Sequence, residues 1–143
     1  MAKDAALRVL VAVAEDARPR MRSIFHRWSE AVFVGQISEL PERGFDLVVI
    51  GAHFDFSRGI ETLVEVLRHR PACPVVCIRA SPFDALGPAS FDAYSMACIE
   101  LGATDVLDLL NFPDDEAGNA RVCALFERLI RAAKCPARER AGR

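Results

Sequence analysis

The chain has 143 residues, of which 52% are hydrophobic and 27% charged, and its formal net charge at pH 7 is −2. This length and composition are typical of one globular domain and exclude an intrinsically disordered chain. Residues 131–143 carry five basic side chains against Glu139, a charge of +4, so residues 1–130 carry about −6, which argues against nucleic acid as the main partner.

The hydrophobic periodicity of the chain predicts strands and helices in alternation. In order they are strand 7–13, helix 19–29, strand 31–34, a short helical segment within 37–44, strand 47–50, helix 60–68, strand 75–78, helix 91–101, strand 105–109 and a helix that ends near 134. Pro19 suits the first turn of helix 19–29. Pro41 limits the helical segment within 37–44 to a turn or two. Gly102 is a natural C-terminal cap for helix 91–101. Asp114 or Asp115 can cap the last helix.

Strict alternation predicts an α/β fold with a five-stranded, parallel, doubly wound sheet of flavodoxin-like type. We expect this domain to span 1–134, with a basic, disordered tail over 135–143 and no output domain in the chain. Residues 81–90 contain Pro82, Gly87 and Pro88 and are expected to form an irregular loop.

The sequence shows no targeting signal and no paired cysteines, which predicts a cytoplasmic protein. The apolar run 5–14 is interrupted by Arg8 and is too short and too charged for a signal peptide or a membrane span. The five cysteines form no C-x-x-C pair, and no histidine lies at zinc-ligand spacing from a cysteine pair, so free thiols are expected. Cys77 and Cys123 fall within apolar patterns and are predicted to lie in the core.

Residues 45–59, FDLVVIGAHFDFSRG, predict a strand that leads into a loop closing on Gly59. This segment resembles the third strand and following loop of two-component receiver domains, whose pattern is about D-L-[apolar]3-D-x-x-[apolar]-P-x-x-x-G. Asp46, Leu47 and Gly59 are in register with that pattern, whereas Gly51 stands where the family has the Asp that accepts the phosphoryl group. A second segment, 102–107 (GATDVL), is similar to the family's G-A-x-D-[YF]-L. The resemblance covers about residues 7–133 and implies the receiver-like (βα)5 fold.

The resemblance also implies a phosphoryl-transfer site at the carboxyl ends of the strands. Two acidic residues after strand one hold Mg²⁺, an Asp after strand three is the acceptor, and a Ser or Thr after strand four and a Lys after strand five bind the phosphoryl group. The residues of this chain at those positions are Val13 and Ala14 for the acidic pair, Gly51 for the acceptor, Arg79 for Ser or Thr, and Leu109 for Lys.

A glycine has no side chain to phosphorylate, so we expect a degenerate pocket, a pseudo-receiver without catalytic residues. Glu15 and Asp16 directly follow the aligned acidic positions, so the expected pocket comprises Gly51, Arg79, Leu109, Glu15 and Asp16. Glu15 and Asp16 are weak candidates for Mg²⁺, but no metal or other cofactor is expected. Their structural alternative is to cap the first helix.

Arg79 carries two functional hypotheses beside that of an exposed surface arginine. Its guanidinium can pair with Glu15, Asp16 or Asp55, fill the old phosphate pocket and lock one conformation. Alternatively, it can bind an anion or a nucleotide at the strand ends. Asp55 is either a displaced phosphoacceptor or a turn-capping residue, and His53 is interpreted as a loop histidine because no nucleophile is paired with it.

We therefore predict an atypical receiver-like domain that acts in signal transduction by protein–protein interaction, without phosphorylation at Gly51 and without enzymatic activity. The expected partner is another signalling protein. The receiver resemblance also implies a possible homodimer through the fourth and fifth helices. Neither nucleic acid nor a membrane is expected as a partner. The alternatives are a phosphorelay receiver with Asp55 as acceptor, or a small anion- or nucleotide-binding flavodoxin-like protein. Phe83, Phe91 and Tyr94 form either an exposed partner patch or part of the core.

Overall fold

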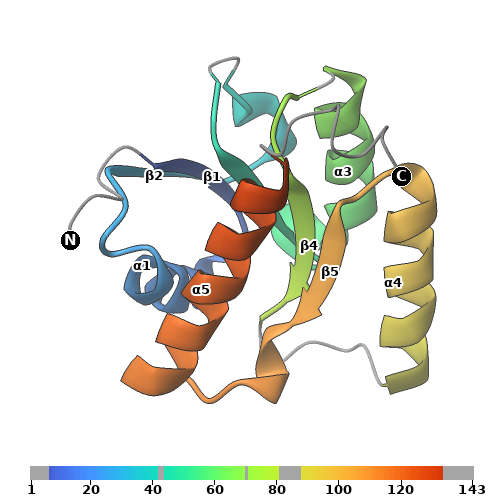
Figure 1. Ribbon diagram of the computed structural model, residues 1–143. Helices are drawn as coiled ribbons and strands as arrows, with labels where there is room; N and C mark the ends of the chain where they lie inside the picture. Colours follow the sequence, from blue (N-terminus) through green and yellow to red (C-terminus); the bar gives the residue numbers. More distant parts are fainter. Residues whose placement is uncertain (1–6, 42–43, 70, 81–87, 134–143) are drawn as a thin grey trace, which may run out of the picture.

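The computed structural model describes residues 7–41, 44–69, 71–80 and 88–133, which form a five-stranded parallel sheet covered by helices (Figure 1). The strand order is β2-β1-β3-β4-β5. The strands are β1 (Arg8–Ala12), β2 (Glu30–Val34), β3 (Leu47–Gly51), β4 (Val75–Arg79) and β5 (Asp105–Asp108). The helices are α1 (Arg18–Ile24), α2 (Phe54–Ser57), α3 (Gly59–Arg68), α4 (Pro88–Leu101) and α5 (Glu116–Ala133), with short 3-10 turns η2 (Glu15–Ala17), η3 (Ile37–Glu39) and η4 (Leu109–Asn111).

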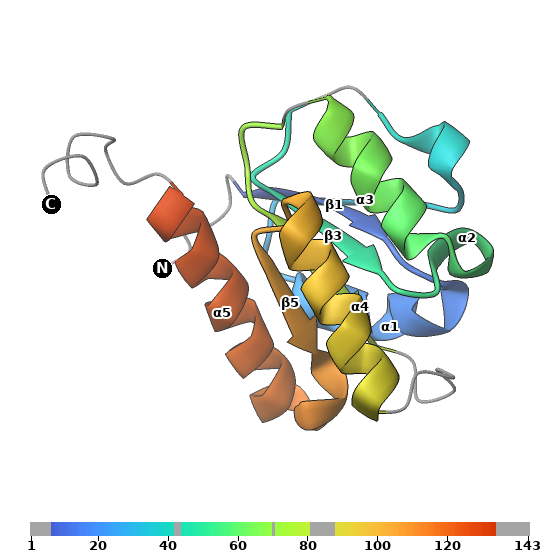
Figure 2. The ribbon, with the colours of Figure 1, turned by 90° about the vertical axis from the view of Figure 1, so that its right-hand side faces the viewer.

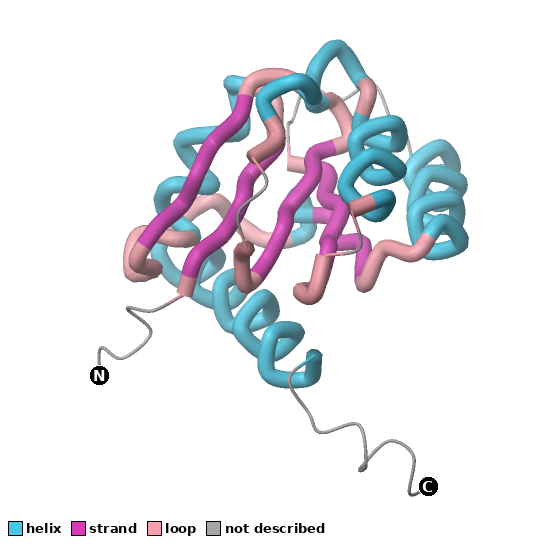
Figure 3. The backbone as a smooth tube through the Cα atoms, turned by 90° about the horizontal axis from the view of Figure 1, so that it is seen from above, coloured by secondary structure: helices cyan, strands magenta, loops and turns pink. Residues whose placement is uncertain are grey.

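The sheet separates two hydrophobic cores, one on each face, and Figure 3 shows helices on both sides of the strands. Successive residues of a strand point to opposite faces, so Val9 and Val11 of β1 face α1 and α5, whereas Leu10 and Ala12 face α3 and α4. Figure 2 shows α5 on one side of the sheet and α3 and α4 on the other. Because both faces are covered, β1 and β3 are almost wholly apolar, as their sequences predicted.

The fold class predicted from the sequence is confirmed, and each strand bound differs from the predicted one by at most one residue. The first helix ends at Ile24 rather than near 29, because Phe25 leaves helical geometry and its ring packs 4.7 Å from that of Trp28. The predicted end of the loop at residue 90 is wrong, because α4 begins at Pro88. Proline is well accommodated in a first helical turn. Residues 81–87 and the predicted tail 135–143 lie outside the described residues.

Two of the predicted helix ends have the expected capping contacts. Gly102 has φ +121°, a left-handed conformation that favours glycine, and its N–H donates to the carbonyl of Cys98 at the end of α4. Asp115 caps α5, because its Oδ1 accepts from the N–H of Gly118 at 2.8 Å. Asp114, the alternative cap, is instead bonded to the side chain of Asn119.

The described cysteines are free thiols. Cys77 is fully buried in the core, as predicted, whereas Cys123 only packs against the core and remains partly exposed. Within the described ranges, no helix is long and apolar enough to cross a membrane.

Candidate functional site

The carboxyl ends of β1, β3 and β4 meet at one edge of the sheet and enclose a very small cavity. Its volume is about 10 Å³, which is close to the minimum for a single water molecule. The residues that line it are Val13, Ala14, Ala17, Gly51, Ala52, His53 and Ala80. Apart from His53 these side chains are apolar or absent, so the cavity offers no carboxylate at the place where a receiver domain carries its acidic residues.

Gly51 is the last residue of β3 and lies against Val13. A Cβ atom at Gly51 would come within 3.3 Å of Val13 Cγ1, so Val13 already occupies part of the space that a longer side chain would need. Glu15 and Asp16 belong to η2 and are exposed rather than part of the cavity wall. Both stand in the first turn of the helical segment that runs into α1, where acidic side chains are favourable to the helix N-terminus, although Ala17 at the N-cap of α1 makes no side-chain cap bond.

The residues at this edge do not fit a magnesium ion. Mg²⁺ prefers several carboxylate and water oxygens in near-octahedral geometry, and the cavity wall supplies no carboxylate. Over the described part of the chain, no three His, Cys, Asp or Glu side chains are arranged to hold a metal ion.

Arg79, at the end of β4, forms an ion pair with Asp108 at the end of β5. The Nε atom lies 3.1 Å from Asp108 Oδ1 and Nη2 lies 2.5 Å from Oδ2, so the fork of the guanidinium meets the carboxylate with two parallel bonds. Both side chains are almost buried, at 12% and 11% exposure, and the Arg79 guanidinium also lies 4.6 Å from the centroid of the Phe91 ring. The bidentate partner of Arg79 is therefore Asp108, rather than Glu15, Asp16 or Asp55 as expected from the sequence. The parallel register aligns Arg79 directly with Asp108.

Leu109, at the position of the family's lysine, is fully buried in the core between the sheet and the helices α1 and α5. Its backbone is held by a buried arginine that the sequence analysis missed. Arg20 of α1 is only 8% exposed, and its Nη1 donates to the carbonyl of Leu109 at 2.9 Å. Its Nη2 donates to the carbonyls of Phe112 and Pro113, at 2.8 and 3.1 Å.

The same guanidinium reaches α5, because its Nε donates to Asn119 Oδ1 at 2.8 Å. Burial lowers the pKa of Arg20 from its ordinary value, and the carboxylates of Asp114 and Asp115 oppose that shift. We call this set of contacts the Arg20 clamp, since it ties α1 to η4 and α5. A sequence signal existed: Ala17, Arg20 and Ile24 recur at helical spacing on the buried stripe of the first helix.

The remaining predicted site residues have structural contacts. Asp55 has φ 53° and its Oδ2 accepts from the N–H of Ile37 at 3.0 Å, which joins the loop after β3 to η3. His53 Nδ1 lies 2.8 Å from Ser57 Oγ. Gly59 lies so close to the end of β3 that a Cβ there would be 2.7 Å from the carbonyl oxygen of Gly51.

Behind Arg79, α4 places Tyr94 and Cys98 against Cys77 of β4. Hydrogen bonding to Cys98 and burial raise the pKa of the Cys77 thiol, and burial raises the pKa of Tyr94. Cys77 and Tyr94 are therefore neutral at physiological pH, whereas the hydrogen bond with Cys77 lowers the pKa of the fully buried Cys98 thiol. Of the aromatic residues left open by the sequence, Phe91 and Tyr94 are half-buried and pack on each other, while Phe83 lies outside the described residues.

No protein-family model and no curated protein matches the chain. Solved structures do match: a CheY-like response regulator receiver domain protein from Methanospirillum hungatei has a TM-score of 0.66 and 12% identity, over 90% of this chain and 97% of that chain. The receiver domain of a Bacteroides fragilis response regulator has a TM-score of 0.63 and 18% identity, over 92% of this chain and 100% of that chain.

The receiver domain of a sensor histidine kinase from Pseudomonas aeruginosa, with a magnesium ion coordinated in its active site cleft, is also similar. Its TM-score is 0.63 at 13% identity, over 88% of this chain and 98% of that chain. At such low identity these matches establish a receiver-like fold and leave function to be argued from the site.

Proposed function

We propose that this chain is a pseudo-receiver, a receiver-like module of two-component signalling that acts through protein–protein contact without accepting a phosphoryl group at Gly51. The observation that carries the proposal is the cavity of about 10 Å³ at the strand ends, whose wall holds neither an acceptor carboxylate nor a magnesium ligand. Phosphoryl transfer requires a nucleophile and positive charge at the transferred group. The two nearby arginines are committed elsewhere, Arg79 to Asp108 and Arg20 to backbone carbonyls.

The two alternative functions have less support from the same contacts. Asp55 gives one carboxylate oxygen to the N–H of Ile37, as a turn-forming residue does. An anion or nucleotide site at Arg79 would have to compete with a bidentate and almost buried carboxylate. Neither residue has a geometry that favours the alternative over the pseudo-receiver.

We propose the outer face of α4 as the contact surface for another signalling protein. Met96 and Ile99, three residues apart on the same side of the helix, are exposed to 67% and 49%. Helix α4 carries apolar residues around its whole circumference, a pattern more typical of a helix that is covered on all sides. Exposed apolar groups gathered on one element are a frequent mark of a protein interaction site.

Titration with Mg²⁺ and then with beryllofluoride, a mimic of the phosphoryl group on Asp, tests the proposal. We expect no binding heat in calorimetry and no change in the melting temperature, because the wall of the strand-end cavity supplies no carboxylate for either reagent. A conventional magnesium-binding receiver domain serves as the positive control. Saturable binding of beryllofluoride that depends on Mg²⁺ would show a working acceptor and contradict the proposal.

A further inference from the structure

Strand β2 is an edge strand of the sheet, and β1 is its neighbour in the strand order. Along a strand, the backbone groups of successive residues bond alternately to one side and to the other. In β1, the carbonyl of Arg8 accepts from the N–H of Asp46, so Arg8 bonds toward β3 and the residues on either side of it bond toward β2. Arg8 is aligned with Glu30 in the parallel register, so Glu30 bonds to β1 and its neighbour Ala31 points to the open side. By the same alternation, the backbone groups of Phe33 also point to the open side.

The open side of β2 lacks the features that usually protect a sheet edge. Such edges commonly carry proline, lysine or a bulge, whereas β2 has the sequence EAVFV and keeps a regular register with β1 along its whole length. Its one charged residue, Glu30, accepts from Nε of Arg8 at 2.9 Å. Among the described residues, the backbone N–H and C=O groups of Ala31 and Phe33 have no hydrogen-bond partner. An added strand would supply these partners, as in the strand-addition mode of peptide recognition.

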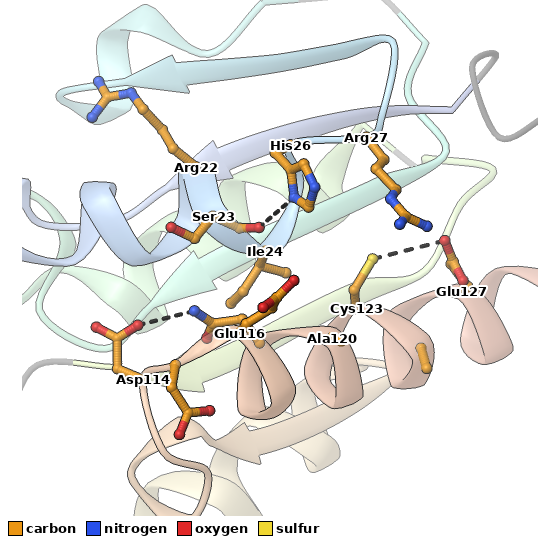
Figure 4. Close-up of a pocket in the computed structure, with 13 residues that line it drawn as sticks. Arg22, Ser23, Ile24, His26, Arg27, Asp114, Glu116, Ala120, Cys123 and Glu127 are labelled. Carbon is orange, nitrogen blue, oxygen red and sulfur yellow. Dashed lines mark hydrogen bonds between the residues drawn. The ribbon is translucent and has the colours of Figure 1, made fainter. Parts of the chain in front are cut away.

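Two arginines of α1 flank this edge on one face of the sheet. The side chains of Ala31 and Phe33 pack against the core under α1 and α5. The guanidinium groups of Arg18 and Arg22 lie 5.9 and 4.9 Å from the centroid of the Phe33 ring. Figure 4 shows Arg22 extending away from α5, on the side of α1 where β2 lies.

The positive charge of this pair of arginines is not neutralised by an ion pair. Three carboxylates occur in the adjoining turns, those of Glu15 and Asp16 in η2 and that of Glu39 in η3. Within the described ranges, none of these carboxylates forms an ion pair with Arg18 or Arg22. The α1 face of the β2 edge is therefore complementary to a partner with negative charge.

We propose that the open edge of β2 binds an extended segment of a partner protein as an added strand, with acidic side chains of that segment facing Arg18 and Arg22. Side chains alternate between the two faces of a strand, so acidic residues at every second position lie on the α1 face, and the residues between them lie beside Val32 on the other face. Backbone bonds supply the affinity, and the two arginines select for negative charge.

A second copy of this chain fits the edge less well than an acidic segment does. A two-fold antiparallel pairing of β2 with itself, centred on Val32, would bring Arg18 and Arg22 of both copies close together, and like charges oppose such an interface. The proposed site is also distinct from the outer face of α4, which lies beside β5 at the other edge of the sheet (Figure 1). It does not depend on the pseudo-receiver function.

Fluorescence anisotropy with a labelled octapeptide of alternating valine and glutamate tests the preference for acidic segments. At low salt the full chain should bind this peptide saturably, and about tenfold or more tightly than the matched peptide of alternating valine and lysine. Arg22→Glu should weaken binding of the glutamate peptide about tenfold or more, because it places like charges together. Arg128→Glu, at an exposed arginine of α5, makes the same change of net charge and should leave the affinity nearly unchanged.

Amide hydrogen exchange by nuclear magnetic resonance tests the backbone pairing. Binding of the glutamate peptide should slow exchange of the Ala31 and Phe33 amides about tenfold or more, because each gains a hydrogen bond. The Val32 amide, which already faces β1, should change little. Ala31→Pro removes only an N–H on the open side, a position where an edge strand tolerates proline, and should abolish peptide binding. Circular dichroism checks that this variant keeps the fold, and the exposed Arg22→Glu gives a test that leaves the backbone unaltered.

Absence of saturable binding overturns the proposal, and so does equal affinity for the two peptides or unchanged exchange at Ala31 and Phe33. Peptide binding that perturbs Met96 and Ile99 instead would place the contact on α4 and overturn it as well. Sedimentation velocity of the chain without peptide tests the second copy as occupant. A dimer that Ala31→Pro dissociates would assign the β2 edge to self-association and contradict the proposed partner.

Discussion

Two regions at the same edge of the sheet differ from the receiver pattern in different ways. At the ends of β1 and β3, the side chains around Gly51 are small or apolar apart from His53, and the cavity there has a volume of about 10 Å³. At the ends of β4 and β5, charge is present but satisfied internally, by the Arg79–Asp108 pair and the Arg20 clamp. Under the proposed pseudo-receiver function, one half of the site lacks polar groups and the other half holds its polar groups in structural contacts.

Gly59 separates what the fold requires from what the chemistry requires. It is in register with the receiver pattern even though the acceptor position is Gly51, so a glycine at this place does not depend on a phosphoryl group nearby. A Cβ at Gly59 would be 2.7 Å from the Gly51 carbonyl oxygen and 3.0 Å from Ala52 Cα, so close packing alone demands glycine.

The largest expected effect comes from breaking the Arg20 clamp. Arg20→Met keeps much of the buried stem but leaves the carbonyls of Leu109, Phe112 and Pro113 without their donor. We expect the free energy of unfolding to fall by about 3–5 kcal/mol, as when a partner is removed from a buried charged network. Urea denaturation measures it, with Arg131→Met, an exposed arginine of α5, as the control that should change it by less than about 1 kcal/mol. Equal effects of the two substitutions would mean that the clamp contributes nothing.

The next effect concerns the Arg79–Asp108 pair. Arg79→Met should lower the free energy of unfolding by about 1.5–3 kcal/mol, because it leaves an almost buried carboxylate with fewer donors. Asp108→Asn should be less harmful in the Arg79→Met background than alone, as a double-mutant cycle by urea denaturation would show. Strict additivity of the two substitutions would exclude a stabilising ion pair at this edge.

A smaller effect is expected at Gly59. Gly59→Ala should lower the free energy of unfolding by about 1–3 kcal/mol, the usual range for a contact that the backbone must move to relieve. Gly44→Ala is the matched control, because a Cβ there has no atom within 4 Å, and it should stay within about 0.5 kcal/mol of the unaltered chain. If both variants were equally stable, close packing would not explain the retention of Gly59.

The smallest effect distinguishes the exposed face of α4 from its buried face. Met96→Lys should change the free energy of unfolding of the monomer by less than about 0.5 kcal/mol, because the side chain is 67% exposed. Cys98→Lys, two residues along the same helix and fully buried, should destabilise it by several-fold more. A large loss of stability in Met96→Lys would place that residue in the core and remove it from the proposed contact surface.

The sheet could be predicted from the sequence because each strand is a short apolar run between turn residues, and because alternation with helices leaves few topologies. The partner of Arg79 was missed for a local reason. The predicted fifth strand ended at 109, one residue too late, so Asp108 was not recognised as a strand end beside Arg79.

Arg20 was missed because the first helix was assigned its buried face from apolar residues alone. An arginine on that stripe becomes predictable only when unpaired carbonyls are expected nearby, and those come from η4, about ninety residues away. The start of α4 was missed because Pro88 was interpreted as a loop residue, although proline is also favoured at a helix start. The first error concerns a contact between distant segments of the chain. The second concerns a residue type, proline, that occurs both in loops and at helix starts.

Intact-mass spectrometry after incubation with acetyl phosphate and Mg²⁺ tests the central claim most directly. The pseudo-receiver account predicts an unchanged mass, because Gly51 has no acceptor and the Asp55 carboxylate is bonded to the backbone of Ile37. A conventional receiver domain treated in parallel should gain one phosphoryl group. A gain of one phosphoryl group by this chain, lost on Asp55→Asn, would contradict the account and identify a displaced acceptor.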